Sequence, residues 1–192
     1  MPSDHLIAVL SDTHVGDRVK YPDPILLQDI QSHQPETILH AGDLCTPAVF
    51  EQLAAIAPVH AVQGNRDWFQ RYALPKTIHT EINGVRITLT HGHINMANYA
   101  FNYLRLFTTG RKMTRKLFQE RLAGLYPDAN LIIYGHTHYQ VDEIVNGQRF
   151  LNPGAGYPHR LNNYQLQYCL LTITASGEVR VQKISIPAPP KL

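Results

Sequence analysis

The chain has 192 residues, of which 44% are hydrophobic and 17% are charged, a composition typical of a globular domain. Its length suits one α/β domain, or at most two small ones, with room for a sizeable core. The net charge of +2 is too small to indicate a nucleic-acid or membrane partner, and the two cysteines exclude a disulfide framework or a cysteine-rich zinc site.

The N-terminal apolar run, residues 6–10, is too short for the hydrophobic region of a signal peptide. No apolar run in the sequence approaches the length that spans a bilayer. We therefore expect a cytoplasmic protein without a membrane partner, by default rather than from a positive signal.

Five short apolar runs share one pattern, because each is followed by polar residues that can bind a metal ion. The runs are rich in β-branched residues and bounded by glycine or polar turns, which is typical of buried strands. In chain order they lead to Asp12 and His14, to Asp43, to Asn65 and Asp67, to His91 and His93, and to His136 and His138.

Helices are expected between the first three of these runs. Residues 23–33 follow a proline, and residues 46–57 start with Thr46 as the N-cap and Pro47 at the first helical position. The order strand, helix, strand, helix, strand predicts right-handed parallel crossovers at the N-terminal end.

The second half of the chain contains signals for antiparallel strands. Asn83-Gly84 and Asn146-Gly147 are typical of hairpin turns, and Ser176-Gly177 is expected to join two further strands. We predict an α/β fold in which two mixed β-sheets pack as a sandwich flanked by helices.

The polar strand ends are expected to meet at one edge of this fold. Ligands of open α/β sheets bind beyond the carboxyl ends of the strands, and residues i and i+2 of an extended segment point to the same side. Chance can place one such group there, but it is a poor explanation for all five runs.

Carboxylate, imidazole and amide donors without a thiolate suit Mn²⁺, Fe²⁺, Ni²⁺ or Zn²⁺. The candidates exceed the ligands of one catalytic ion but suffice for two ions if one carboxylate bridges them. Two adjacent ions form a clamp for displacement at phosphorus and make hydroxide available near neutral pH. The predicted metal ligands are Asp12, His14, Asp43, Asn65, His91, His136 and His138.

The ordered blocks "DTH", "GD", "GNRD", "HGH" and "GHTH", followed by "NPG", resemble the calcineurin-like metallophosphoesterase superfamily between about residues 6 and 155. "GDLCT" and "HGH" resemble its small branch, which includes prokaryotic phosphodiesterases and the retromer subunit that shares their fold. The resemblance implies a metallophosphoesterase-like αββα sandwich. We predict one such domain at residues 1–186, with a helical insertion at about 95–126 and a proline-rich tail at 187–192.

The resemblance also implies how the donors divide between two ions, for which we expect Mn²⁺ first and Fe²⁺, Ni²⁺ or Zn²⁺ as alternatives. A hydroxide held between the ions would attack phosphorus. One ion would take Asp12, His14, Asp43 and His138, and the other would share Asp43 as a bridge with Asn65, His91 and His136.

The catalytic candidates are Asp43 and Asn65 together with Arg66, Asp67 and His93. Many members of the superfamily have histidine where this chain has Arg66. Arginine cannot donate a proton but can hold phosphate oxygens with a bidentate fork, so we expect diesters to be favoured over monoesters. Asp67 is expected to orient a neighbour or form a turn, and His93 is the alternative proton donor or a solvated histidine.

The segment 95–126 is the least family-like part, and its apolar spacing predicts a helix, a turn and a second helix. Residues 105–121 contain six basic residues and one acidic residue. They could steer a nucleotide or hold a nucleic-acid backbone, although a solvated helical face is favoured. The apolar faces could instead join copies of the chain into a homo-oligomer.

The leading hypothesis is a metal-dependent phosphodiesterase that acts on a small phosphodiester or nucleotide. One alternative is a non-catalytic interaction module of the same fold, as in the retromer subunit. A narrower version of the leading hypothesis is a nucleotide or nucleic-acid phosphodiesterase that uses the basic segment 105–121.

Overall fold

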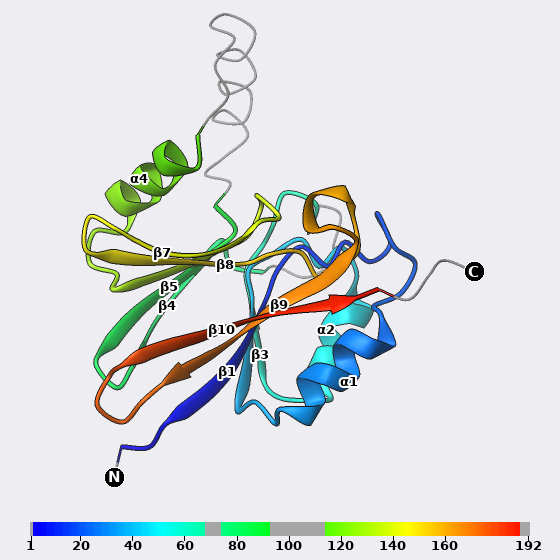
Figure 1. Cartoon of the computed structure of the whole chain (residues 1–192), viewed down its shortest axis with the longest axis horizontal. Helices are drawn as coiled ribbons and strands as arrows, with labels where there is room; N and C mark the ends of the chain where they lie inside the picture. Colours follow the sequence, from blue (N-terminus) through cyan, green and yellow to red (C-terminus); the bar gives the residue numbers. More distant parts are fainter. Residues whose placement is uncertain (1, 68–73, 93–113, 189–192) are drawn as a thin grey trace, which may run out of the picture.

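The computed structural model describes residues 2–67, 74–92 and 114–188, which form two mixed five-stranded sheets packed against each other (Figure 1). In the first sheet, β1, β2 and β3 are parallel, and β9 and β10 add antiparallel strands in the order β10-β9-β1-β2-β3. The parallel crossovers predicted at the N-terminal end are therefore confirmed. The bounds are β1 His5–Leu10, β2 Thr37–His40, β3 Val59–Ala61, β9 Gln165–Ile173 and β10 Val179–Pro187.

The second sheet has the order β4-β5-β6-β8-β7, with parallel central strands and antiparallel strands at both edges. Its strands are β4 Thr77–Ile82, β5 Val85–Thr90, β6 Leu131–Tyr134, β7 Gln140–Val145 and β8 Gln148–Pro153. The predicted turns join the expected pairs: Asn83-Gly84 connects β4 to β5, and Asn146-Gly147 connects β7 to β8. All four of these residues have a positive φ, as the tightest hairpin turns require.

Helices cover the outer faces of both sheets. α1 (Pro24–Ser32) and α2 (Pro47–Ala54) lie against the first sheet, and α4 (Arg115–Leu125) lies beside the second (Figure 1). Asp23 caps α1 by accepting a hydrogen bond from the Ile25 N–H, whereas Thr46 occupies the N-cap of α2 without a capping hydrogen bond. A short 3-10 turn, η2 (Arg160–Asn162), precedes β9.

α4 matches the second of the two helices predicted in the segment 95–126. The first predicted helix, like His93, lies outside the described residues. The insertion and the domain bounds therefore stay predictions.

The central strands are apolar on both faces because each face packs against a different layer. In β1, Ile7 and Val9 point between the sheets, while Ala8 and Leu10 pack against α1 and α2. The same alternation in β6 places Ile133 between the sheets and Tyr134 near α4. This packing of two sheets between outer helices confirms the predicted sandwich and fixes the ends of β1, β2, β3, β5 and β6 relative to one another.

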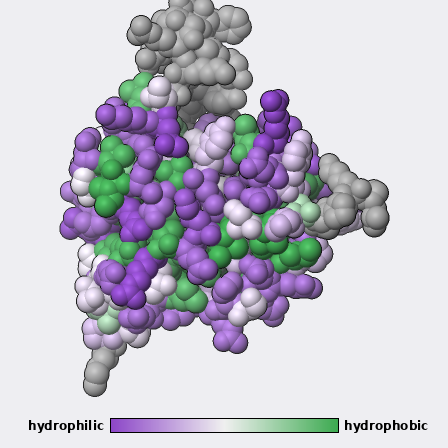
Figure 2. Space-filling model, in the orientation of Figure 1, coloured by the Kyte–Doolittle hydropathy of each residue, from purple (hydrophilic) through white to green (hydrophobic). Residues whose placement is uncertain are grey.

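Hydrophilic residues predominate on the face of the molecule seen in Figure 2, with hydrophobic residues between them in small groups. Scattered exposed apolar side chains are ordinary for a globular protein. Within residues 2–67, 74–92 and 114–188, no helix combines the length and the apolar character that crossing a membrane requires.

Candidate metal centre

The loops that follow β1, β2, β3, β5 and β6 bring the predicted ligands together at one edge of the sandwich. The first group surrounds Asp12 and contains two histidines from distant parts of the chain. Nε2 of His138 lies 3.1 Å and Nε2 of His14 lies 3.8 Å from Asp12 Oδ1, and the two nitrogens are 3.4 Å apart. His14 comes from the first sheet and His138 from the second, so this group spans both layers.

The second group surrounds Asn65. Its Oδ1 lies 3.0 Å from Nε2 of His91 and 3.1 Å from Nδ1 of His136. Asp43 lies between the two groups, because its Oδ2 is 3.5 Å from Nε2 of His14 and 3.6 Å from Nε2 of His91. This is the position that a bridging carboxylate would need.

The candidate ligands leave one buried carboxylate oxygen without a hydrogen bond. Asp12 is completely buried, and its Oδ1 has no hydrogen bond of acceptable geometry. An unsatisfied buried carboxylate oxygen is costly, and a cation would satisfy it. Asp12, His14 and His138 form one cluster of possible ligand atoms, and Asp12, Asp43 and His91 form another. The His and Asp clusters are therefore consistent with a site for two metal ions.

The backbone at this edge adopts an uncommon conformation. Left-handed φ values occur at five of the predicted ligands, a region that non-glycine residues visit rarely and that recurs at functional sites. The positions and their φ values are Asp12 51°, His14 49°, Asp43 58°, His136 68° and His138 60°. The convergence of the donors is thus built into tight turns at the strand ends.

Neighbouring groups hold several of these side chains in place. Nδ1 of His91 lies 2.7 Å from the Ala41 carbonyl oxygen, to which it donates, so that Nε2 is left to face Asp43. The backbone N–H of His136 donates to Asp12 Oδ2 at 3.0 Å. Asn152, from the "NPG" block, donates to the Gly135 carbonyl at 2.8 Å and thereby steadies the loop that carries both histidines.

Electrostatics differ between the two carboxylates. Burial alone would raise the pKa of Asp12, but the imidazoles of His138 and His14 beside its carboxylate outweigh burial and hold that pKa well below its usual value. Burial raises the pKa of Asp43, and the nearby charge of Asp12 adds to this effect. Two buried carboxylates repel each other, and a bound cation would reduce this repulsion.

Asp67 and Arg66 lie beside the ligands and make different contacts. Asp67 is buried, and its Oδ2 accepts hydrogen bonds from the backbone N–H of Asp43 at 2.8 Å and of Gly64 at 2.7 Å. Asp67 therefore contacts the backbone of a neighbour rather than the cluster of ligand atoms. Arg66 donates its backbone N–H to Asp43 Oδ1 at 2.7 Å, while 48% of its side chain is exposed.

Sequence reasoning missed Asp17, whose Oδ2 lies 3.1 Å from Nδ1 of His14. The available signal was weak, because Asp17 follows a glycine in a turn rather than the end of an apolar run. Two aromatic rings also border the site. The Tyr157 ring is 5.1 Å from that of His14, and the His159 ring is 4.9 Å from that of His138.

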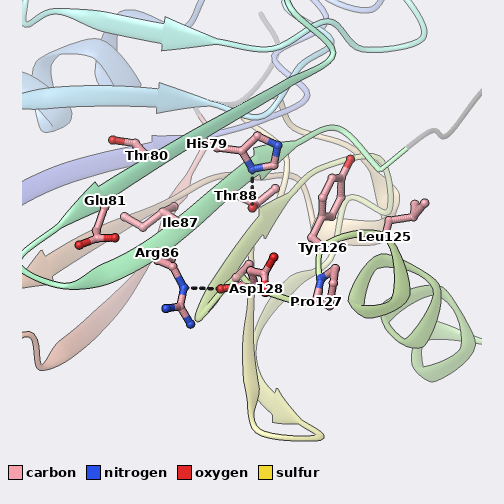
Figure 3. A pocket seen from close by; sticks show the side chains of 11 residues that line it. His79, Thr80, Glu81, Arg86, Ile87, Thr88, Leu125, Tyr126, Pro127 and Asp128 are labelled. Carbon is pink, nitrogen blue, oxygen red and sulfur yellow. Dashed lines mark hydrogen bonds between the residues drawn. The ribbon is translucent and has the colours of Figure 1, made fainter.

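A separate groove with a volume of about 590 Å³ lies over β4, β5 and the segment after α4 (Figure 3). It contains none of the predicted ligands. His79 and Thr88 are hydrogen-bonded to each other, and Arg86 donates to the Asp128 carbonyl oxygen. Among the described residues, the clusters of possible ligand atoms lie at the strand ends, and none of them includes a residue of this groove.

Comparison with known proteins agrees with this arrangement. Residues 6–176 match the calcineurin-like phosphoesterase superfamily domain. A probable metallophosphoesterase of Methanothermobacter thermautotrophicus is 34% identical over 161 residues, which cover 82% of this chain and 81% of that protein. The phosphodiesterase MJ0936 of Methanocaldococcus jannaschii is 27% identical over 164 residues, covering 77% and 82% of the two chains.

Solved structures show the same fold. Vps29 of Entamoeba histolytica, complexed with Zn²⁺, is 25% identical with a TM-score of 0.63 and covers 94% of this chain and 98% of that one. A structurally and functionally characterised archaeal phosphodiesterase is 22% identical with a TM-score of 0.54, covering 93% and 99%.

Proposed function

Because the chain belongs to the calcineurin-like phosphoesterase superfamily, we propose that it is a metal-dependent phosphodiesterase that hydrolyses P–O bonds. The observation that carries this proposal is the convergence of carboxylate, imidazole and amide donors from both sheets, with Asp43 between two groups. The phosphodiesterase named among its relatives supports the reaction class.

In this proposal, two divalent ions would be held by the predicted ligands. Asp12, His14 and His138 would hold one ion, Asn65, His91 and His136 would hold the other, and Asp43 would contact both. The ions would supply hydroxide near neutral pH and neutralise charge on the phosphoryl oxygens. Mn²⁺ is our first choice, and the Zn²⁺ bound by a Vps29 structure of the same fold keeps zinc as an alternative.

The chain's own side chains would bind and orient the substrate. Arg66 lies next to Asp43 in space, and its half-exposed guanidinium can form two parallel hydrogen bonds with a phosphoryl group. A guanidinium cannot protonate a leaving group. Diesters with good leaving groups are therefore the proposed substrate class, in preference to monoesters.

A non-catalytic interaction module of the same fold is the second candidate, supported by the likeness to Vps29. Metal binding alone would not separate the two candidates, because a Vps29 structure binds Zn²⁺ as well. Hydrolysis has to be measured directly.

The test is the hydrolysis of bis-p-nitrophenyl phosphate by purified protein with Mn²⁺, Fe²⁺, Ni²⁺ or Zn²⁺, with metal content measured in parallel. We expect turnover that a chelator abolishes, and slower hydrolysis of the monoester p-nitrophenyl phosphate. Asp43→Asn should reduce turnover to background and lower the metal content, because the bridge between both ions is weakened. Asp128→Asn, in the groove of Figure 3, is the matched control and should behave as wild type.

Inertness with all four ions would support the interaction module. Retained turnover in Asp43→Asn would refute the bridging role.

A further inference from the structure

His14 has two ring nitrogens, and only one of them faces the other candidate ligands. Its Nε2 lies 3.5 Å from Asp43 and 3.4 Å from Nε2 of His138. Its Nδ1 points away and lies 3.1 Å from Oδ2 of Asp17. The His14 side chain is 4% exposed and that of Asp17 is 31% exposed, so the contact joins a buried ring to a carboxylate at the surface.

The local backbone places Asp17 against His14. The N–H groups of Asp17 and Arg18 both donate to the His14 carbonyl oxygen, at 3.2 Å and 2.8 Å. Gly16 has a φ of 89°, and a side chain there would meet Thr46 Cγ2 at 2.7 Å. Glycine therefore lets this turn form without strain, and the turn folds Asp17 back over the ring three residues earlier.

The contact determines which nitrogen of His14 carries the proton. An ionised carboxylate only accepts hydrogen bonds, so Nδ1 donates to Asp17, and in the neutral imidazole that a metal ion requires Nε2 keeps its lone pair for the site. The sulfur of Cys45 is the competing partner at 3.7 Å from Nδ1, and a thiol is a much weaker acceptor than a carboxylate.

The same oxygen of Asp17 also faces two guanidinium groups. It lies 3.4 Å from Nε of Arg18 and 3.9 Å from Nε of Arg66. One carboxylate therefore stands between a candidate metal ligand and the side chain assigned to the substrate phosphate.

We propose that Asp17 is a positioning residue that acts on the metal site through His14 and on the substrate through Arg66. This inference rests on the proposed function of the same site. Removing a carboxylate that orients a metal-binding histidine costs about 10–100-fold in metal affinity, because the ring loses its fixed orientation and part of its basicity.

The first experiment measures Mn²⁺ binding by calorimetry without substrate, in wild type, Asp17→Ala, Asp17→Asn and Asp128→Asn. Asp17→Ala should raise the Kd about 10–100-fold. Asp17→Asn should have a smaller effect, because its amide oxygen can still accept from Nδ1. Asp128→Asn should match wild type. In the Zn²⁺-loaded protein, the NMR signal of the hydrogen-bonded His14 Nδ1–H should be present in wild type and lost in Asp17→Ala.

The second experiment uses steady-state kinetics with bis-p-nitrophenyl phosphate to separate the effect of Asp17 on the metal site from its effect on the substrate. Arg66→Gln should raise KM and leave the Kd for Mn²⁺ unchanged. Asp17→Ala should raise both KM and the Kd for Mn²⁺. The double variant, Asp17→Ala with Arg66→Gln, should raise KM no further than Arg66→Gln alone, because Asp17 acts on the substrate through Arg66 and the two effects are then not additive.

One outcome would overturn the role of Asp17 alone. In that outcome wild type binds Mn²⁺ and hydrolyses the diester, while Asp17→Ala has the same Kd and an unchanged Nδ1–H signal. A wild type that binds neither Mn²⁺ nor Zn²⁺ would overturn the proposed function, and this inference with it. Asp17→Asn keeps the comparison valid if Asp17→Ala folds poorly.

Discussion

Both carboxylate oxygens of Asp67 accept hydrogen bonds from backbone N–H groups of the loops that hold candidate ligands. Oδ2 takes those of Asp43 and Gly64, and Oδ1 takes that of Cys45 at 2.8 Å. Gly64 has to be glycine here, because an added Cβ would collide with Asp43 Oδ1. The position of Asp43 therefore depends on a carboxylate that is not itself in the cluster of ligand atoms.

Asp67→Asn should destabilise the protein by about 1–3 kcal/mol, because the amide NH₂ would face a backbone N–H and leave a buried donor without an acceptor. Metal affinity should fall as well, since Asp43 would lose its fixed position. Urea unfolding and Mn²⁺ calorimetry measure the two effects. Asp128→Asn serves as the control, and a wild-type unfolding curve for Asp67→Asn would contradict the prediction.

The convergence of the candidate ligands could be predicted from the sequence because each follows an apolar run, and strand ends meet at one edge of a sheet. The contact of Asp17 with His14 could not, because a turn folds it back through backbone hydrogen bonds that leave no periodic pattern. Asp67 was predicted to orient a neighbour, but the sequence could not say which backbone groups it would contact.

Among the helices, α4 is attached to the second sheet mainly by one apolar side chain and one polar one. Leu122 is buried against Ile132, Tyr134 and Phe150. Gln119 is also buried, and its side-chain amide donates to the Tyr134 hydroxyl and to Glu143.

Phe118 of the same helix stacks on His136, with ring centroids 6.3 Å apart. The helix thus reaches from the sheet to the candidate metal centre.

Leu122→Ala should lower the free energy of unfolding by about 2–5 kcal/mol, because it leaves a cavity under α4. Gly124→Ala in the same helix should instead raise that free energy by up to about 1 kcal/mol, since an added Cβ there meets nothing within 4 Å. Chemical denaturation of both variants measures the difference. Equal stabilities would show that α4 contributes little to the fold.

Most elements could be predicted, because their signals are local. Alternating burial, proline at the helix starts and the Asn-Gly turns each depend on a few neighbouring residues. The pairing of β9 with β1 could not be predicted, since it joins residues at opposite ends of the chain. The missing capping bond of Thr46 is a detail of side-chain rotation that the sequence does not encode.

On the scale of the whole molecule, burial of thiols and phenols limits stability at high pH. Burial raises the pKa of Cys169 from 9.0 to about 12 and that of Tyr134 from 10.0 to about 12. Burial also raises the pKa values of Cys45 and Tyr168. In each case the folded state disfavours the anion.

The contribution of these thiols and phenols to the free energy of unfolding should therefore be constant below their unfolded-state pKa values and be lost as the pH rises from about 9 toward 12, since the unfolded chain then binds fewer protons than the folded one. Urea unfolding across this range measures the slope. Cys169→Ala should make the slope shallower, because one of the titrating groups is gone. A free energy of unfolding that stays level to the top of this range would contradict the prediction.

The division of the candidate ligands between the two sheets has a consequence during synthesis. Asp12, Asp43 and Asn65 leave the ribosome well before His136 and His138, so the emerging chain holds an unfinished set of donors until the second sheet has formed. In the proposed function, the metal ions would therefore bind only after the second sheet has formed. Once bound, they would link the two sheets and oppose their separation.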